Sequence, residues 1–189
     1  MKYLMLLLFL LESGAVHAFP DCAFRKFNFT VNDIVSSLTI STLNRNADVF
    51  IVNVKPKDGA DYVGRFFIFD GQCNAEYVQK LDYYPISVFI LDDGFSGVIF
   101  NLMQSGDGTY ILDAYYLSET NVSKIINEAT SNPFRPAFVN DPDASAPTVK
   151  TYNRFYKICD TYKFNNKKKR YIKNKSNKIC KFNNNEYCC

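Results

Sequence analysis

The residues that could do chemistry in this chain are limited by one fact: its only histidine, His17, lies in a segment with the features of an export signal. Lys2, the apolar run 4–11 and the small residues around Ala18 predict cleavage after Ala18, so that residues 1–18 are a signal peptide. The remaining chain has no imidazole for Ser-His-Asp or Cys-His catalysis or for the common histidine metal sites. We therefore predict a secreted, extracellular protein that is not an enzyme and that holds no metal and no cofactor.

The cysteines and glycosylation motifs fit the same secretory route. The chain has six cysteines, which should be oxidised in an exported protein, and six cysteines allow 15 pairings that spacing alone does not resolve. Their wide separation favours bridges between distant segments over a metal knuckle. Three Asn-x-Ser/Thr motifs predict N-glycosylation at Asn28, Asn121 and Asn174.

Charge divides the chain into two parts. Residues 19–150 carry 10 basic and 16 acidic side chains, whereas residues 151–189 carry 11 basic and 2 acidic ones. The second part includes a run of four cations, Lys167, Lys168, Lys169 and Arg170. Such a run can bind an anionic glycan or a membrane surface, and the secretory route argues against nucleic acid. The alternative is a solvated tail of biased composition: we expect residues 161–189 to form a basic, Asn/Lys-rich tail that is disordered beyond Lys163.

Period-two alternation of apolar residues predicts a mainly β protein of the antiparallel class. The expected strands span 22–31, 34–43, 49–54, 62–69, 86–91, 97–103 and 109–116, with a further strand at 151–159. Residues 72–84 are expected to form a long connection. Asp92-Asp93-Gly94 and residues 105–108 have the composition of hairpin turns. The strands at 86–91, 97–103 and 109–116 are therefore predicted to form a meander.

A single helix is expected after these strands. Ser118 can cap it, and Val122, Ile125, Ile126 and Ala129 follow a helical spacing over residues 119–130. Because short turns join the strands and no helices separate them, a parallel sheet is excluded. An up-and-down barrel of about 7–8 strands with one C-terminal α-helix removes exposed strand edges, so we prefer it to a sandwich.

The order of these segments resembles the lipocalin family, in particular its apolipoprotein D-like branch. The likeness rests on a cysteine that opens a strand ending in Asn28-Phe29-Thr30, on the segment 84–93 with Leu91-Asp92-Asp93, and on the late helix. It covers about residues 22–159. The chain lacks the Gly-x-Trp first strand of that family, since it contains no tryptophan. The resemblance implies a lipocalin-like barrel domain at 19–160 and a disulfide from Cys22 to a cysteine after the helix, with Cys159 the first candidate.

Two functions follow as expectations. The first is a secreted carrier or scavenger that binds a small hydrophobic molecule in the barrel cavity; the alternative is a secreted interaction protein without a cavity, which engages a polyanion or host protein through its basic tail. Alternation places the same set of side chains inward whether they line a cavity or fill a core. The predicted inward residues are Phe27, Phe29, Leu38, Ile40, Phe50, Val52, Phe66, Ile68, Val88, Ile90, Phe100, Leu102, Leu112 and Tyr116.

Overall fold

The computed structural model describes residues 19–41, 48–91, 97–153, 158–174, 177–182 and 185–188, the last two ranges by their backbone alone. After helix α1 (Asp21–Phe27) and a short 3-10 turn (Val31–Asp33), every regular element is a strand. The strands are β1 (Ile34–Ile40), β2 (Val49–Val54), β3 (Gly64–Asp70), β4 (Ala75–Leu81), β5 (Tyr84–Phe89), β6 (Val98–Gln104), β7 (Tyr110–Leu117), β8 (Val122–Ser131), β9 (Ala137–Val139), β10 (Thr148–Asn153), β11 (Ile158–Asn165), β12 (Arg170–Lys173), β13 (Asn177–Phe182) and β14 (Asn185–Cys188).

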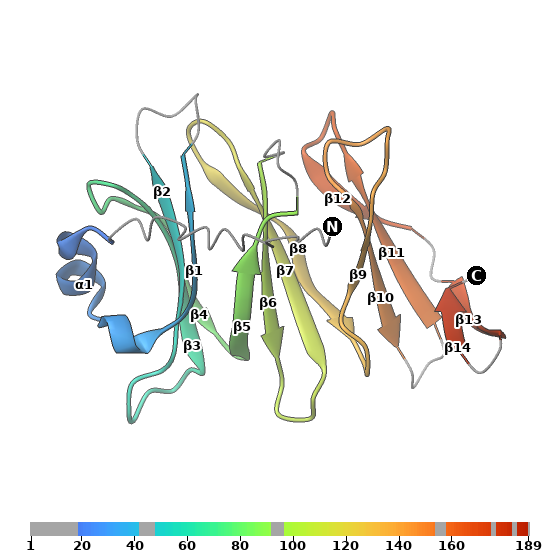
Figure 1. The fold of residues 1–189 in the computed structure, drawn as a ribbon, viewed down its shortest axis with the longest axis horizontal. Coiled ribbons are helices and arrows are strands. Elements are labelled where there is room, and N and C mark those ends of the chain that lie inside the picture. The colour runs from blue at the N-terminus through green and yellow to red at the C-terminus, as the bar shows by residue number, and fades with distance from the viewer. Residues whose placement is uncertain are drawn as a thin grey trace, which may run out of the picture.

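These strands form three antiparallel sheets that follow one another along the chain. The first sheet has the order β1-β2-β3-β4 and the second the order β5-β6-β7-β8. The third runs β14-β13-β11-β10-β9, with β12 also paired to β11. From left to right, Figure 1 shows α1, the first sheet, the second sheet and the third sheet as successive layers. The expectation of a mainly β, antiparallel protein is therefore confirmed.

The predicted closed barrel is wrong for the part of the chain that the structure describes. The strands there form three separate open sheets, each with its own edge strands. Stacking offers another way to bury both faces of a sheet. Strands in the middle of a stack need apolar residues on both faces, and β2 and β6 are buried at nearly every position. The continuous apolar runs in these strands are thus the signature of layers packed on both sides, which the sequence interpretation assigned to a barrel wall.

Three separate cores fill the spaces between the layers. The α1 core lies between α1 and the outer face of the first sheet and includes Phe27 and Phe69. The first-second core includes Phe66 and Tyr115, and the second-third core includes Phe100 and Phe164. Each core combines residues from two layers, so that the layers are joined by burial of apolar surface.

The predicted helix at 119–130 is wrong, because most of this segment is strand β8. In its pairing with β7, Leu112 lies opposite Ala129 and Ala114 opposite Ile126. One residue of β7, Asp113, is thus matched by two of β8, which is a β-bulge, and Glu128 within it has a φ of 51°. The bulge brings Ile126 and Ala129 into the same core despite their spacing of three. The helix-like spacing in the sequence came from this bulge.

The other strand predictions have mixed outcomes. The expected strand at 22–31 is wrong: Asp21 stands in the first turn of α1, and Asn28 ends the helix in a left-handed conformation. The expected connection at 72–84 contains β4. The tail expected to be disordered beyond Lys163 instead continues β11 to Asn165 and includes β12, β13 and β14.

Candidate functional site

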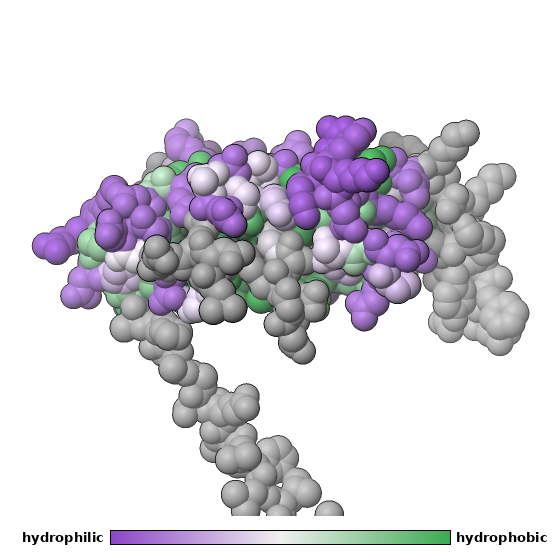
Figure 2. Space-filling view, turned by 90° about the horizontal axis from the view of Figure 1, so that it is seen from above, coloured by the Kyte–Doolittle hydropathy of each residue, from purple (hydrophilic) through white to green (hydrophobic). Residues whose placement is uncertain are grey.

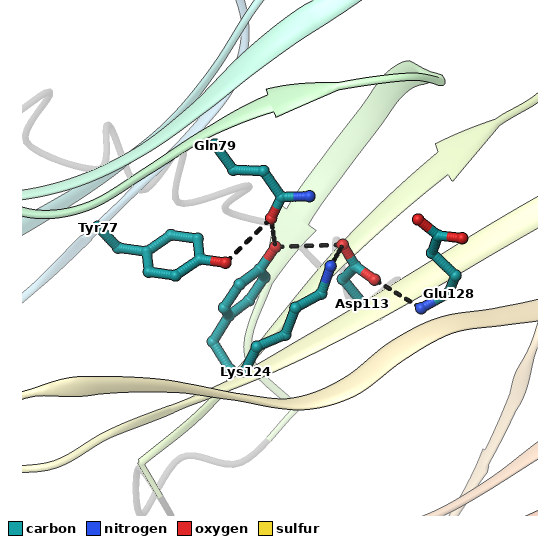
Figure 3. Close-up of polar contacts among 6 residues, drawn as sticks. Tyr77, Gln79, Asp113, Lys124 and Glu128 are labelled. Atoms are coloured by element: carbon teal, nitrogen blue, oxygen red, sulfur yellow. Dashed lines mark hydrogen bonds and ion pairs between the residues drawn. The ribbon is translucent and has the colours of Figure 1, made fainter.

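A chain of polar side chains crosses the first-second core, and no part of it was predicted. Asp113 on β7 is completely buried, and its Oδ2 lies 2.7 Å from the Nζ of Lys124 on β8. The phenol of Tyr115 lies 3.2 Å from the same oxygen and 2.9 Å from Oε1 of Gln79 on β4. In Figure 3, Tyr77 and Gln79 reach from the first sheet toward Asp113 in the second. We call these residues the polar seam.

Both carboxylate oxygens of Asp113 have partners within the chain. Oδ1 of Asp113 accepts the backbone N–H of Glu128 at 2.8 Å, so the carboxylate also holds the bulge of β8. Burial, together with the neighbouring Asp113 charge, raises the pKa of Tyr115 far above its usual value, which keeps its phenol a hydrogen-bond donor. Acid–base chemistry needs a group that a substrate can reach, and Asp113 has none of its side chain exposed. The hydrogen bond from Tyr115 to Gln79 joins the two sheets inside their shared core.

A second part of the seam joins two amides. Nδ2 of Asn53 on β2 donates to Oδ1 of Asn101 on β6, and Asn53 also donates to the hydroxyl of Ser36. Asn101 lies directly opposite Asp113 across β6 and β7. The sequence held a signal for these residues: Asn53, Asn101 and Asp113 are each the only polar residue inside an otherwise apolar run of their strand.

The basic run is exposed in the hairpin formed by β11 and β12. Lys167, Lys168 and Lys169 form the turn between β11 and β12, and Arg170 begins β12. All four are exposed. None forms an ion pair with another described residue, whereas Lys173 nearby is paired with Asp160 at 2.7 Å. Figure 2, which views the molecule from above Figure 1, shows a strongly hydrophilic projection over this part of the molecule. We call these four residues the basic turn.

The basic turn is held by bonds on both sides. Oδ1 of Asn166 accepts from the backbone N–H and the hydroxyl of Ser145, at 3.0 and 2.8 Å, and its Nδ2 donates to the carbonyl of Asp143. Oδ1 of Asn165 accepts the N–H of Lys168 at 2.9 Å. The turn is thus fastened to the β9–β10 loop and is presented by a defined hairpin.

The aromatic residues beside the basic turn face inward. Phe164 and Tyr171 lie opposite each other on β11 and β12 and are buried in the second-third core. The Tyr171 hydroxyl donates to the carbonyl of Pro147 at 2.8 Å, and burial raises the pKa of this phenol. Tyr162 is half-buried against the same core. These rings anchor the hairpin and leave the cations as the exposed part of it.

The residues predicted to line one cavity are divided among the three cores. Each group lies between a different pair of layers, and the three groups do not meet in one space. Phe27, Phe29, Phe50 and Val52 lie in the α1 core; Ile40, Phe66, Ile68 and Val88, with Leu38 and Ile90 packed against them, lie in the first-second core; Phe100, Leu102 and Leu112, with Tyr116 beside them, lie in the second-third core.

The predicted disulfide is wrong, since Cys22 is bonded to Cys73. This bond joins α1 to the turn after β3. Cys73 lies in the α1 core and Cys22 packs against it. Cys159 is also disulfide-bonded, to a partner other than Cys22. The asparagines of the three predicted glycosylation motifs, Asn28, Asn121 and Asn174, are exposed, and their modification stays a prediction.

Metal-binding clusters, membrane-spanning helices and known relatives are three further points that concern function. Among the side chains that the structure describes, no three His, Cys, Asp or Glu residues are grouped to hold a metal ion. None of the helices in the described ranges has the length and hydropathy to span a bilayer. No family model and no curated protein matches the chain, so the lipocalin resemblance stays untested.

Proposed function

We propose that this protein is a secreted binding protein that engages a sulfated polysaccharide through the basic turn. The observation that carries the proposal is the exposure of four consecutive cations, without acidic partners among the described residues, on a hairpin whose geometry is fixed by Asn165 and Asn166. Cations held in place need little ordering when an anion binds, so more of the electrostatic attraction appears as affinity.

The position of the aromatic rings favours a polysaccharide over a membrane. Stable membrane attachment by a short basic segment usually combines cations with apolar groups that insert into the lipid. The rings that flank the cations in the sequence, Phe164 and Tyr171, are buried in the second-third core and cannot insert while the hairpin is folded. Sulfate groups require only the cations and hydrogen-bond donors that the turn exposes.

Among the described residues, the side chains expected to surround a ligand do not gather around one space, which gives less support to a carrier role. The fourteen residues expected to surround a ligand pack instead into three cores between layers. Displacement of an apolar dye by candidate ligands would still test that role. The polyanion role depends on the surface of the hairpin and not on a cavity, and for this reason we prefer it.

The direct test is retention on heparin in a salt gradient, with affinity measured by titration calorimetry. We expect the unchanged protein to bind and the variant K167Q/K168Q/K169Q/R170Q to lose most of its affinity. Each cation removed from the contact lowers the slope of log affinity against log salt, by up to about one unit per cation. Circular dichroism verifies that the variant is folded, as expected for four exposed side chains.

The matched control is K26Q/K55Q/K57Q/K80Q, which removes the same charge from exposed lysines at the opposite end of the stack. It should retain nearly full affinity. Equal losses in both variants would show that net charge alone governs retention and would overturn the assignment to the turn. Tighter binding to phosphatidylserine vesicles than to heparin would assign the turn to a membrane surface instead.

A further inference from the structure

The outer face of the third sheet carries two cations, Lys150 and Lys163, in addition to those of the basic turn. Val149, Phe164 and Tyr171 point from β10, β11 and β12 into the second-third core. Because neighbouring residues of a strand point to opposite faces, the residues next to them in sequence face away from the second sheet. These residues are Lys150, Lys163 and Arg170.

The register of the three strands sets these cations on a diagonal line. Lys150 on β10 lies opposite Thr161 on β11, two residues before Lys163. Lys163 in turn lies opposite Ile172 on β12, two residues after Arg170. Each step along the line therefore moves one strand across and two residues along, and diagonal neighbours of this kind are about 7–8 Å apart. The line ends at Arg170, where the basic turn begins.

Most of the charge on this line is not neutralised. Lys163 has one acidic neighbour, Asp141, at a loose 4.0 Å, and 58% of the lysine side chain remains exposed. Lys150 and Arg170 form no ion pair with a described residue. Lys173 is excluded from the line because its position opposite Tyr162 turns it to the other face, and because Asp160 holds it and raises its pKa. Among the carboxylates of the described residues, Asp141 is thus the one paired with the line.

We propose that Lys150, Lys163 and Arg170 form a linear track that extends the basic turn, so that the ligand is a sulfated polysaccharide of several sugar units and not a compact anion. This inference rests on the proposed function and specifies its ligand. A compact anion reaches only one or two cations at this spacing, because attraction between solvated charges is largely screened beyond about 8 Å at physiological salt. A polymer with charges repeated along its length contacts the whole line, and each added contact benefits from those already made.

Binding of heparin fragments of defined length tests the track. We expect the unchanged protein to bind a long heparin fragment at least about tenfold more tightly than a heparin disaccharide. The variant K150Q/K163Q should lose about tenfold in affinity for the long fragment, because exposed charge pairs each contribute up to about 1 kcal/mol. Its affinity for the disaccharide should not change, since the turn is intact.

Two further variants sharpen the test. K55Q/K80Q is the matched control: Lys80 is exposed and loosely paired, with Asp61 at 3.6 Å, much as Lys163 is with Asp141. This control should bind the long fragment normally. D141N removes the carboxylate beside the track and should strengthen binding of the long fragment severalfold, an effect that damage to the fold would not produce.

The outcomes separate the track from the proposed function. If K150Q/K163Q binds the long fragment as the unchanged protein does, while the basic-turn variant does not, the track is wrong and the turn site stands. Equal affinity of the unchanged protein for disaccharide and long fragment also overturns the track. If the unchanged protein binds no heparin of any length, the proposed function itself fails.

Discussion

Asn53 and Asn101 are hydrogen-bonded at 2.8 Å between β2 and β6, and so connect the first and second sheets inside an otherwise apolar core. Both residues are fully buried, and the other polar atom of each amide, Oδ1 of Asn53 and Nδ2 of Asn101, has no hydrogen-bond partner among the described residues. A partly satisfied buried pair costs stability relative to apolar residues of similar size. Its benefit is geometric, because the bond forms only when the two sheets are aligned.

The first prediction concerns this amide pair. Asn101→Leu alone should destabilise the protein by about 1–3 kcal/mol, since it leaves the Nδ2 group of Asn53 without its acceptor across the interface. The double variant Asn53→Leu/Asn101→Leu should recover most of that loss. Urea unfolding of the two single variants and the double variant measures the coupling. A double variant as unstable as the sum of the single ones would contradict the pair's role.

A second prediction concerns the ion pair of the polar seam. Lys124→Met should destabilise the protein by about 3 kcal/mol, because it leaves the fully buried Asp113 carboxylate without its cation. Asp113→Asn added to this change should restore part of the stability, since the buried group is then uncharged. Thermal unfolding at neutral pH provides the comparison. Lys80→Met, which removes an exposed lysine, is the control and should change stability by less than about 1 kcal/mol.

Much of the fold was open to prediction, and the errors have physical causes. The alternation in 34–40 and the continuous apolar run in 49–54 identified β1 and β2 because hydrophobic patterning is a local property. Closure into a barrel is a global property. A strand in the middle of a stack of sheets is buried on both faces, and its apolar run does not by itself distinguish it from a buried strand of another architecture. The bulge at Glu128 places Ile126 and Ala129 in the same core at a spacing of three, which is also typical of a helix.

The candidate site was predicted in part. The basic run was identified from charge alone, yet its presentation by a hairpin depends on the burial of Phe164 and Tyr171, which charge does not reveal. The polar seam was missed, although single polar residues in apolar strands such as Asn101 mark buried hydrogen bonding. The diagonal track could not be seen before the register of β10, β11 and β12 was known.

A third prediction follows from the pKa of Asp70 at the turn after β3. Burial opposes ionisation of this carboxylate, but hydrogen bonds from Asn74 and from the N–H of Gln72 outweigh it and lower the pKa below the ordinary value of 3.8. A carboxylate with a lowered folded-state pKa contributes stability above its unfolded pKa and loses this contribution as the pH falls. Asp70→Asn should therefore cost about 1 kcal/mol at pH 7.

The sign of this effect is tested by acid. The stability difference between Asp70→Asn and the unchanged protein should shrink as the pH falls below about 4, where Asp70 of the unfolded chain becomes protonated. Urea unfolding at neutral and acidic pH measures it. A difference that is constant across this range would show that shape, and not charge, makes the aspartate important at this turn.

A fourth prediction separates the shape of the basic turn from its charge. Asn166→Ala removes the hydrogen bonds to Ser145 and to the carbonyl of Asp143 without changing any charged residue. The cations then need to be ordered when the ligand binds, which costs about 0.5–1.5 kcal/mol for each side chain fixed. Heparin affinity should fall by about two- to tenfold, with an unchanged slope against salt because the same cations contact the ligand. Asn140→Ala is the control, since this exposed residue of the same loop makes no side-chain hydrogen bond with a described residue; an equal loss in both variants would show that the fastening by Asn166 does not matter for binding.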